Sequence, residues 1–334
     1  MTVQEKSYRS VINRLGVVML VLFGGIAVYR TAASEVLPLL LSGLPTVTAS
    51  IVGELVLALL YSAAFLVPVF LFFRISRCKP CAPFDATPDL PRGTFLYVLA
   101  ALGIIGAAAY INTFVVNLFE FVSLFGDNAV ESSAATPRAG YQLILVFITT
   151  AIVPAFVEEA LFRGVVLKNL LPYGRTTAVF VSALLFGVMH QNAAQLFYAT
   201  VAGLVIGYIY AYTKSIFTCV LIHFCNNAFS VLLSILHERL PLERAALADT
   251  LAYATLLLLG LFAAVLLLRL HRDAQGDLLL NGCFERDTAP DAEYAAEPLS
   301  LARRVRLLFT PPMIVFFALC ATQVLYMLVL AVLF

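Results

Sequence analysis

Charge is scarce in this sequence. Only 12% of its 334 residues are charged and 62% are hydrophobic, whereas a soluble domain carries about 25% charged residues. The formal net charge of +1 excludes the strongly basic surface that nucleic-acid-binding proteins present. The sequence therefore predicts an all-α, polytopic helical transmembrane protein that has the lipid bilayer, and no nucleic acid, as a partner.

Several chemical motifs are also missing. There is no His-Glu-x-x-His run of the kind that holds zinc in many proteases. The chain has six cysteines, but only Cys78-Lys79-Pro80-Cys81 has a metal-like spacing, and a structural zinc site needs four ligands. We expect ordinary reduced thiols there. No internal repeat is evident, which disfavours an inverted-repeat transporter, and the first apolar run lacks a small-residue cleavage site, so it reads as a retained span.

Long apolar runs are plentiful, and they predict about eight or nine membrane spans. The segment 30–50 leaves the count open by one, because its mixed composition suits either a surface segment or a re-entrant turn. The polar stretch 271–306 is expected to be a loop. The predicted spans are 11–29, 51–73, 94–114, 141–170, 176–190, 194–212, 216–236, 251–270 and 313–334.

Basic residues predict the orientation in the membrane. If the spans alternate, the amino terminus, the 74–92 loop, the 168–175 turn, Lys214 and the 269–306 loop all fall on one side. Lys and Arg accumulate in cytoplasmic loops. We therefore expect a cytoplasmic N-terminus and a C-terminus on the opposite side.

The most unusual polar stretch is Val157-Glu158-Glu159-Ala160-Leu161-Phe162-Arg163-Gly164, which follows the uncharged run 143–156. An ionisable side chain inside a bilayer costs roughly 2.5 to 3.5 kcal/mol. On a helix, Glu159 and Arg163 share a face and can pair, while Glu158 is turned about 100° away and is left free. The alternative is a helix end that emerges among the headgroups with a solvated charge cluster.

Three more polar side chains lie in apolar spans. His190 ends one span, and His223 and Asn227 are four residues apart on another, so the last two share a helix face. Taken singly, each suits a hydrogen-bonded helix–helix contact. Taken together with the glutamate pair on consecutive spans, they indicate one site.

Depth along the helices supports a common location. Glu158, His190 and His223 lie roughly 10 to 22 Å from the cytoplasmic ends of their spans at about 1.5 Å per residue. They converge in the inner to middle part of the bilayer only if the helix of Glu158 continues past Arg163. We then expect a conical, water-filled active-site cavity within the bilayer, open to the cytoplasm.

The residue types suit hydrolysis of an amide. A carboxylate and imidazoles can take a proton from water and return one to a leaving amine. The Asn227 amide can donate a hydrogen bond to a developing oxyanion. Direct attack by water is the simplest interpretation, because no serine or cysteine is clearly placed as a nucleophile.

The motifs resemble those of the CPBP family of intramembrane proteases, which includes the eukaryotic Ras-converting CAAX prenyl endopeptidase and bacterial Abi and bacteriocin-processing proteins. The resemblance covers residues 141–236. It implies an endopeptidase of a bacterial cell membrane that acts on a membrane-associated protein or peptide. The motifs that carry it are Glu158-Glu159-x-x-x-Arg163, Phe186-x-x-x-His190 and His223-x-x-x-Asn227.

The resemblance also implies residue roles. Glu158 would activate the water with help from His190, and His223 and Asn227 would hold the water or stabilise the oxyanion. Arg163 and Phe186 would give structural support, Arg163 by pairing with Glu159. The implied catalytic set is Glu158, Glu159, His190, His223 and Asn227.

Some questions stay open at this point. The family is usually labelled metalloprotease, and zinc here would need ligands from three separate helices; a glutamate–water mechanism needs no metal, and we lean towards it. The predicted organisation is N-terminal helices at 1–140, a catalytic core at 141–236, and C-terminal helices with a polar cytoplasmic loop at 237–334. The competing functions are a non-catalytic membrane scaffold or regulator of the same fold, and a proton-coupled transporter that uses the glutamates and histidines as a relay.

Overall fold

A computed structural model of the chain describes residues 1–76, 90–121, 140–270 and 299–333. These residues form helices and no strand, as expected where lipid cannot satisfy backbone N–H and C=O groups. In chain order the elements are α1 (Val3–Thr31), η1 (Ala32–Val36), α2 (Leu37–Leu41), α3 (Thr46–Ser76), α4 (Thr94–Phe121), α5 (Gly140–Val146), η2 (Phe147–Ile152), α6 (Val153–Leu161), η3 (Phe162–Leu167), α7 (Lys168–Leu170), η4 (Leu171–Tyr173), α8 (Arg175–Val188), α9 (Ala193–Thr213), α10 (Ile216–His237), α11 (Leu242–Leu270), α13 (Leu301–Leu308) and α14 (Pro311–Leu333).

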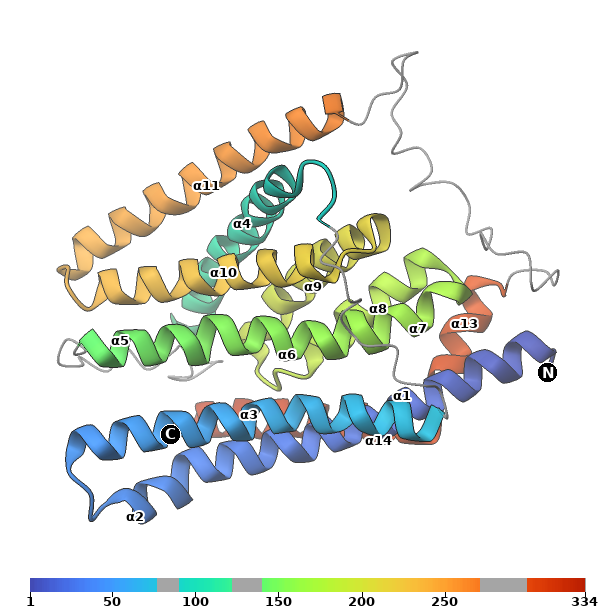
Figure 1. The fold of residues 1–334 in the computed structure, drawn as a ribbon, viewed down its shortest axis with the longest axis horizontal. Helices are drawn as coiled ribbons and strands as arrows, with labels where there is room; N and C mark the ends of the chain where they lie inside the picture. The colour runs from blue at the N-terminus through green and yellow to red at the C-terminus, as the bar shows by residue number, and fades with distance from the viewer. Residues whose placement is uncertain (77–89, 122–139, 271–298, 334) are drawn as a thin grey trace.

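The long helices run roughly along one common direction (Figure 1). Helices α1, α3 and α14 pack together on one side of the bundle, and α4 and α11 pack together on the other. Between them lie α6, α8, α9 and α10, with α6 in contact with both α3 and α10. This middle group carries the motif residues, and α3 is the neighbour that covers it from the N-terminal side.

The two ends of the bundle differ in the way the basic residues predict. The start of α1, the turn between α7 and α8, and α13 lie at one end, whereas α2 and the start of α5 lie at the other (Figure 1). The basic segments near the N-terminus and around 168–175 therefore share an end. That this end faces the cytoplasm stays a prediction.

The number of helices able to cross a membrane is near the predicted range. By length and composition, the described part of the chain holds seven, or eight if the bent pair Leu301–Leu308 and Pro311–Tyr326, which meets at 73°, forms one span. The predicted span at 176–190 accounts for the difference. It is helix α8, whose 14 residues rise only about 21 Å, less than the roughly 30 Å of a hydrocarbon core.

The ambiguous segment at 30–50 is mostly helical. Helix α1 continues through η1 into α2, so that Val3–Leu41 is one helical segment of 39 residues. Pro38 lies in the first turn of α2, where a missing backbone N–H is tolerated. The next span begins at Thr46, five residues before the predicted start.

The prediction of a loop over 271–306 is partly wrong, because helix α13 begins within this range. Arg304 of this helix is buried, and its guanidinium donates to the Leu299 carbonyl at 2.7 Å and to Thr177 Oγ1 at 3.0 Å. Arg303 forms an ion pair with the buried Glu5. These contacts fix α13 against the starts of α1 and α8. Residues 271–298, and with them part of the expected loop, lie outside the described residues, as do Cys78 and Cys81.

Small residues allow α4 and α11 to approach closely. A Cβ added to Gly103 would lie 2.7 Å from the Gly260 Cα, and one added to Gly260 would lie 2.6 Å from the Gly103 Cα. Either distance is shorter than side chains tolerate. Helix association in lipid relies on such close contact of backbones, so these two glycines set the spacing of this helix pair.

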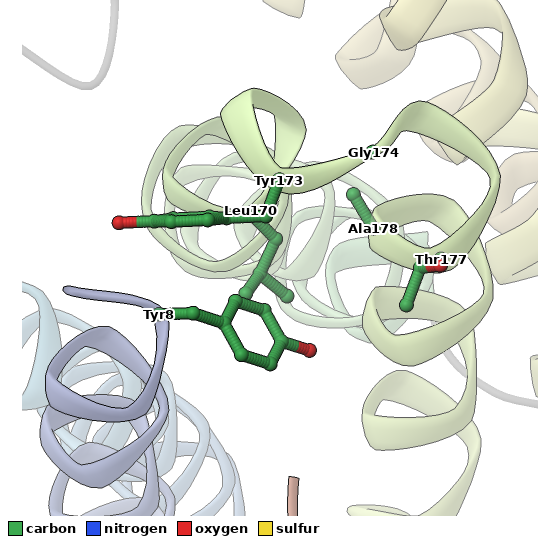
Figure 2. A pocket seen from close by; sticks show the side chains of 6 residues that line it. All are labelled: Tyr8, Leu170, Tyr173, Gly174, Thr177 and Ala178. Atoms are coloured by element: carbon green, nitrogen blue, oxygen red, sulfur yellow. The ribbon is translucent and has the colours of Figure 1, made fainter. Parts of the chain in front are cut away.

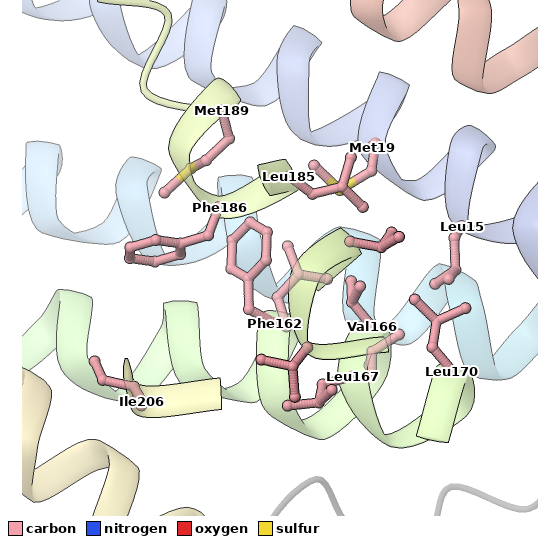
Figure 3. Packing of buried hydrophobic residues seen from close by; sticks show 14 of the residues in the cluster. Leu15, Met19, Phe162, Val166, Leu167, Leu170, Leu185, Phe186, Met189 and Ile206 are labelled. Atoms are coloured by element: carbon pink, nitrogen blue, oxygen red, sulfur yellow. The ribbon is translucent and has the colours of Figure 1, made fainter. Parts of the chain in front are cut away.

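The middle helices pack through one apolar core. Leu15 and Met19 of α1 face Val166 and Leu185 in this core, which continues to Phe162 (Figure 3). All five side chains have no exposed surface. Apolar contacts thus hold the helical segment that bears the glutamate pair. Because the backbone is held, we expect the two glutamates to keep a fixed position.

Candidate active site

The glutamate pair lies in the middle of a single long helical segment. Gly140–Tyr173 is helical over 34 residues, which confirms the expectation that the helix continues past Arg163. Within it, the short α-helix α6 carries Glu158 and Glu159. It is flanked by two π-helical stretches, η2 and η3. Such stretches recur at functional sites. Sequence reasoning did not foresee them.

Glu159 is the most enclosed acid of the site. Its Oε1 accepts a hydrogen bond from Arg163 Nη1 at 2.8 Å, which confirms the predicted pair, and lies 2.8 Å from His223 Nδ1. Arg163 Nη2 also donates to the Gly203 carbonyl at 3.3 Å. Glu159 and Arg163 are 0% and 1% exposed. The arginine therefore compensates the buried carboxylate, and the carboxylate in turn orients the imidazole.

The two carboxylate oxygens of Glu158 have different surroundings. Its Oε1 accepts a hydrogen bond from the Tyr61 hydroxyl of α3. Its Oε2 is buried without a hydrogen-bond partner among the described residues and lies 3.9 Å from His223 Nε2. The expectation that Glu158 is free was wrong for one oxygen, because a neighbouring helix approaches it from a part of the sequence that carries no recognisable motif.

His190 lies in the turn after α8 rather than within a helix. Its Nδ1 is 2.8 Å from the Phe186 carbonyl, and it interacts electrostatically with Glu158 and His223. The next residue, Gln191, has a φ of 55° and is 4% exposed. Arg30 donates to the His190 carbonyl at 2.9 Å and to Gln191 Oε1 at 3.1 Å. An arginine of α1 thus fixes the turn that presents His190.

Phe186 is the apolar centre of the cluster. The Arg163 guanidinium lies 5.1 Å above its ring, a favourable cation–π distance. The rings of His190 and His223 meet it edge-on, with centroid distances of 5.2 and 5.9 Å. Phe162 contacts it in the same way at 5.1 Å (Figure 3). The expected structural support from Phe186 agrees with these contacts.

Asn227 occupies the predicted helix face but its amide is partly used. Its Nδ2 donates to the Thr150 carbonyl at 3.1 Å, and its Oδ1 accepts from Asn226 at 3.2 Å. Pro154 lacks the N–H that would bond to Thr150 in an α-helix, so the Asn227 amide supplies a donor to that carbonyl. One of its two amide hydrogens remains for another acceptor.

The arrangement brings all the predicted side chains except Asn227 together, from α6, η3, α8 with the turn after it, and α10. Glu158, Glu159, Arg163, Phe186, His190 and His223 form one connected cluster. Tyr61 is the participant that sequence reasoning missed. A tyrosine in an apolar span is too common to stand out alone.

The sequence left open whether the site binds a metal ion. Among the described residues, no three His, Cys, Asp or Glu side chains are grouped so that they could hold one. His223 Nδ1 is taken up by Glu159 and His190 Nδ1 lies against a carbonyl. The residues present do not fit a metal centre, and no step below involves one.

A small pocket lies away from this cluster, at the end of the bundle where α1 begins. Tyr8, Tyr173 and Thr177 line it, together with Leu170, Gly174 and Ala178 (Figure 2). Its lining residues are not part of the acid–histidine cluster. The expected water-filled cavity at the glutamate pair therefore stays a prediction.

The fold and the cluster define a polytopic helical membrane protein with a buried acid–histidine site. Residues 140–229 match the model of the family described as type II CAAX prenyl endopeptidase Rce1-like. This segment contains the motif residues from Glu158 to Asn227, so the match supports their resemblance to the CPBP/CAAX protease family.

One curated relative agrees with this assignment. It is a protein of Bacillus subtilis (strain 168) named "Putative membrane peptidase YdiL", which is 30% identical over 103 residues. The similarity covers 30% of this chain and 41% of the relative, so the chain spans about two fifths of the length of the curated relative that it matches. No solved structure matches the chain.

Proposed function

We propose that this protein is an intramembrane endopeptidase that hydrolyses a peptide bond of a membrane-associated protein or peptide, using water activated by Glu158. One observation carries the proposal. Glu158 Oε2 is buried, has no hydrogen-bond partner among the described residues, and faces His223 Nε2 across 3.9 Å. Two hydrogen bonds of about 2.8 Å that meet at one water oxygen span roughly 4 to 4.5 Å, so the two atoms suit a shared water.

The contacts of Glu159 support a defined state of His223. If Nδ1 carries the proton and donates it to Glu159 Oε1, Nε2 has a lone pair directed towards Glu158. A water between them donates one hydrogen to Glu158 Oε2 and one to Nε2, which leaves an oxygen lone pair for attack. Arg163 forms an ion pair with Glu159 and holds its carboxylate in place. Glu159 and Arg163 therefore position the histidine and do not touch the substrate.

The reaction balances with these groups alone. Glu158 takes a proton from the water as its oxygen bonds to the substrate carbonyl carbon, which gives a tetrahedral oxyanion. The remaining Asn227 amide hydrogen suits stabilisation of this charge, and His190, which interacts electrostatically with Glu158, assists the base. Glu158 then returns the proton to the amide nitrogen as the carbon–nitrogen bond breaks. The products are a carboxylic acid and an amine.

The membrane setting limits the substrate class. Glu158, Glu159 and His223 lie inside helices long enough to cross a bilayer, so the substrate bond must reach that depth within or beside the lipid. We infer a cytoplasmic N-terminus from the distribution of basic residues. We place the protein in a bacterial cell membrane because of its resemblance to bacterial members of the family. In this proposal, residues 141–236 are the catalytic core, flanked by helices 1–140 and 237–334.

A comparison of peptide termini in membranes tests the function. Cells that produce the wild-type protein are compared with cells that produce Glu158→Gln, which keeps the side-chain shape but is not a base. Glu35→Gln, which changes an exposed acid of η1, is the matched control. We expect new protein termini in wild-type and Glu35→Gln membranes that are missing with Glu158→Gln. Identical termini in all three samples would contradict the proposal.

A further inference from the structure

The carboxylate of Glu158 depends on a residue outside the segment that matches the family model. Tyr61 belongs to α3, whereas the match covers residues 140–229. Its hydroxyl donates to Glu158 Oε1. This hydrogen bond holds Glu158 from a neighbouring helix, and its two residues lie 97 positions apart in the sequence.

The Tyr61 ring is held from two sides. Tyr29 of α1 meets it edge-on, with a centroid distance of 5.3 Å, and Phe65 of α3 contacts it at 5.0 Å. Phe65 has no exposed surface. A ring held in this way has little rotational freedom, so its hydroxyl stays directed at the carboxylate. The direction is set by packing of α1 against α3 and of α3 against α6.

This contact gives the two Glu158 oxygens different roles. With Oε1 bonded to Tyr61, the carboxylate plane is fixed and Oε2 is the oxygen that faces His223 Nε2. Without the hydroxyl, the carboxylate can rotate and direct either oxygen away from the imidazole. Catalysis is sensitive to such changes, because a misplacement of about 1 Å can reduce a rate about 100-fold.

We propose that Tyr61 is a positioning residue for this site: its hydroxyl holds Glu158 Oε1 so that Oε2 remains directed at the water position beside His223. The proposal rests on the proposed function, since it assigns Tyr61 a role through the base of that reaction. It also means that the matched segment alone does not make a complete site, because α3 supplies one of its polar contacts.

Steady-state kinetics of Tyr61→Phe test the proposal. The probe is a fluorogenic peptide that carries a cleavage site mapped in the comparison of membranes, and the full-length protein is assayed in detergent. Because the ring and its packing remain, we expect the kcat of the folded protein to fall about 10- to 100-fold, with KM changed less than about twofold. The melting temperature should fall only slightly, because Glu158 Oε1 loses one donor. A role in folding alone would lower the melting temperature and leave the kcat of the folded protein unchanged.

Tyr110→Phe is the matched control. It also removes a tyrosine hydroxyl from a contact between helices, the one with Thr250 at 3.3 Å, but on the far side of the bundle. We expect wild-type kcat for this variant. Wild-type kcat in Tyr61→Phe, or a loss of kcat that follows loss of folded protein, overturns the role of Tyr61. If Glu158→Gln also cleaves the peptide normally, the proposed function itself fails; if only Tyr61→Phe does, this inference alone fails.

Discussion

Glu158 and Glu159 are neighbours in the sequence, but their carboxylates have different surroundings. Glu159 is bonded to Arg163 and His223, both within the segment that matches the family model. Glu158 is bonded to Tyr61 from another part of the chain, and its second oxygen faces the imidazole without a hydrogen bond. The charge of Glu159 is compensated by Arg163, whereas Glu158 faces the position proposed for the reacting water.

This difference separates structure from chemistry. A buried carboxylate paired with a guanidinium is costly to disturb, because removing one partner leaves an uncompensated charge. Each glutamate has an Oε2 that is buried without a hydrogen-bond partner among the described residues, but that of Glu158 lies opposite His223 Nε2, at 3.9 Å, and Glu158 has no arginine partner there. We therefore expect changes around Glu159 to affect stability first, and changes at Glu158 to affect turnover first.

The largest expected effect is on turnover in Glu158→Ala. Loss of a general base typically reduces the rate about 100- to 10,000-fold. Cleavage of the fluorogenic peptide should fall by that factor while the protein still purifies as a folded monodisperse sample. Glu35→Ala, at an exposed acid of η1, should cleave normally. Near-normal cleavage by folded Glu158→Ala protein would remove Glu158 from the mechanism.

The next effect is on stability in Arg163→Ala. Breaking a buried ion pair costs about 3 to 5 kcal/mol, so the yield of folded protein and the melting temperature should drop. Arg244→Ala, at an exposed position of α11, should change the free energy of unfolding by no more than about 0.5 kcal/mol. If Arg163→Ala melts like the wild type yet loses turnover, Arg163 belongs with the catalytic residues.

A smaller effect is expected for Asn227→Ala. The variant removes the hydrogen bond that the Asn227 amide donates to the carbonyl of the exposed Thr150, and such a bond contributes about 0.5 to 1.5 kcal/mol. Asn169→Ala is the control, since the Asn169 amide bonds to a carbonyl of its own helix at 2.7 Å. Thermal melts of both variants measure the difference. Equal melting temperatures in wild type and Asn227→Ala would show that the amide serves chemistry alone.

The smallest effect is expected for His237→Ala. His237 Nε2 lies 2.7 Å from Asp249 Oδ2, but the histidine side chain is 47% exposed. Exposed pairs contribute about 0 to 1 kcal/mol, so the melting temperature should hardly move. His223→Ala, at the buried imidazole beside Glu159, should lower it clearly. Similar losses in the two variants would argue against the contrast drawn here between buried and exposed pairs.

The sequence was informative where a contact lies within one helix. The Glu159–Arg163 pair follows from a spacing of four residues on one helical segment. Length and hydropathy likewise predicted the helices and their approximate number. Such inferences rest on the geometry of the α-helix, which is the same for every sequence that forms one.

Contacts between helices were less accessible. The approach of Tyr61 to Glu158 depends on the register in which α3 packs against α6, and periodicity does not fix a register. The helix at 301–308 was missed because its polar residues resemble those of a loop, while Arg304 is in fact buried. The helical turns after Thr31 were missed because proline and glycine nearby suggested a break.

Two isosteric variants measured side by side test the central claim most directly. Glu158→Gln and Glu159→Gln are purified in the same detergent, and each is assayed for peptide cleavage and for its melting temperature. We expect Glu158→Gln to melt like the wild type without detectable cleavage. We expect Glu159→Gln to melt at a lower temperature, because Arg163 loses its charged partner, while its folded fraction still cleaves the peptide. A folded Glu158→Gln protein that cleaves at the wild-type rate would contradict the account.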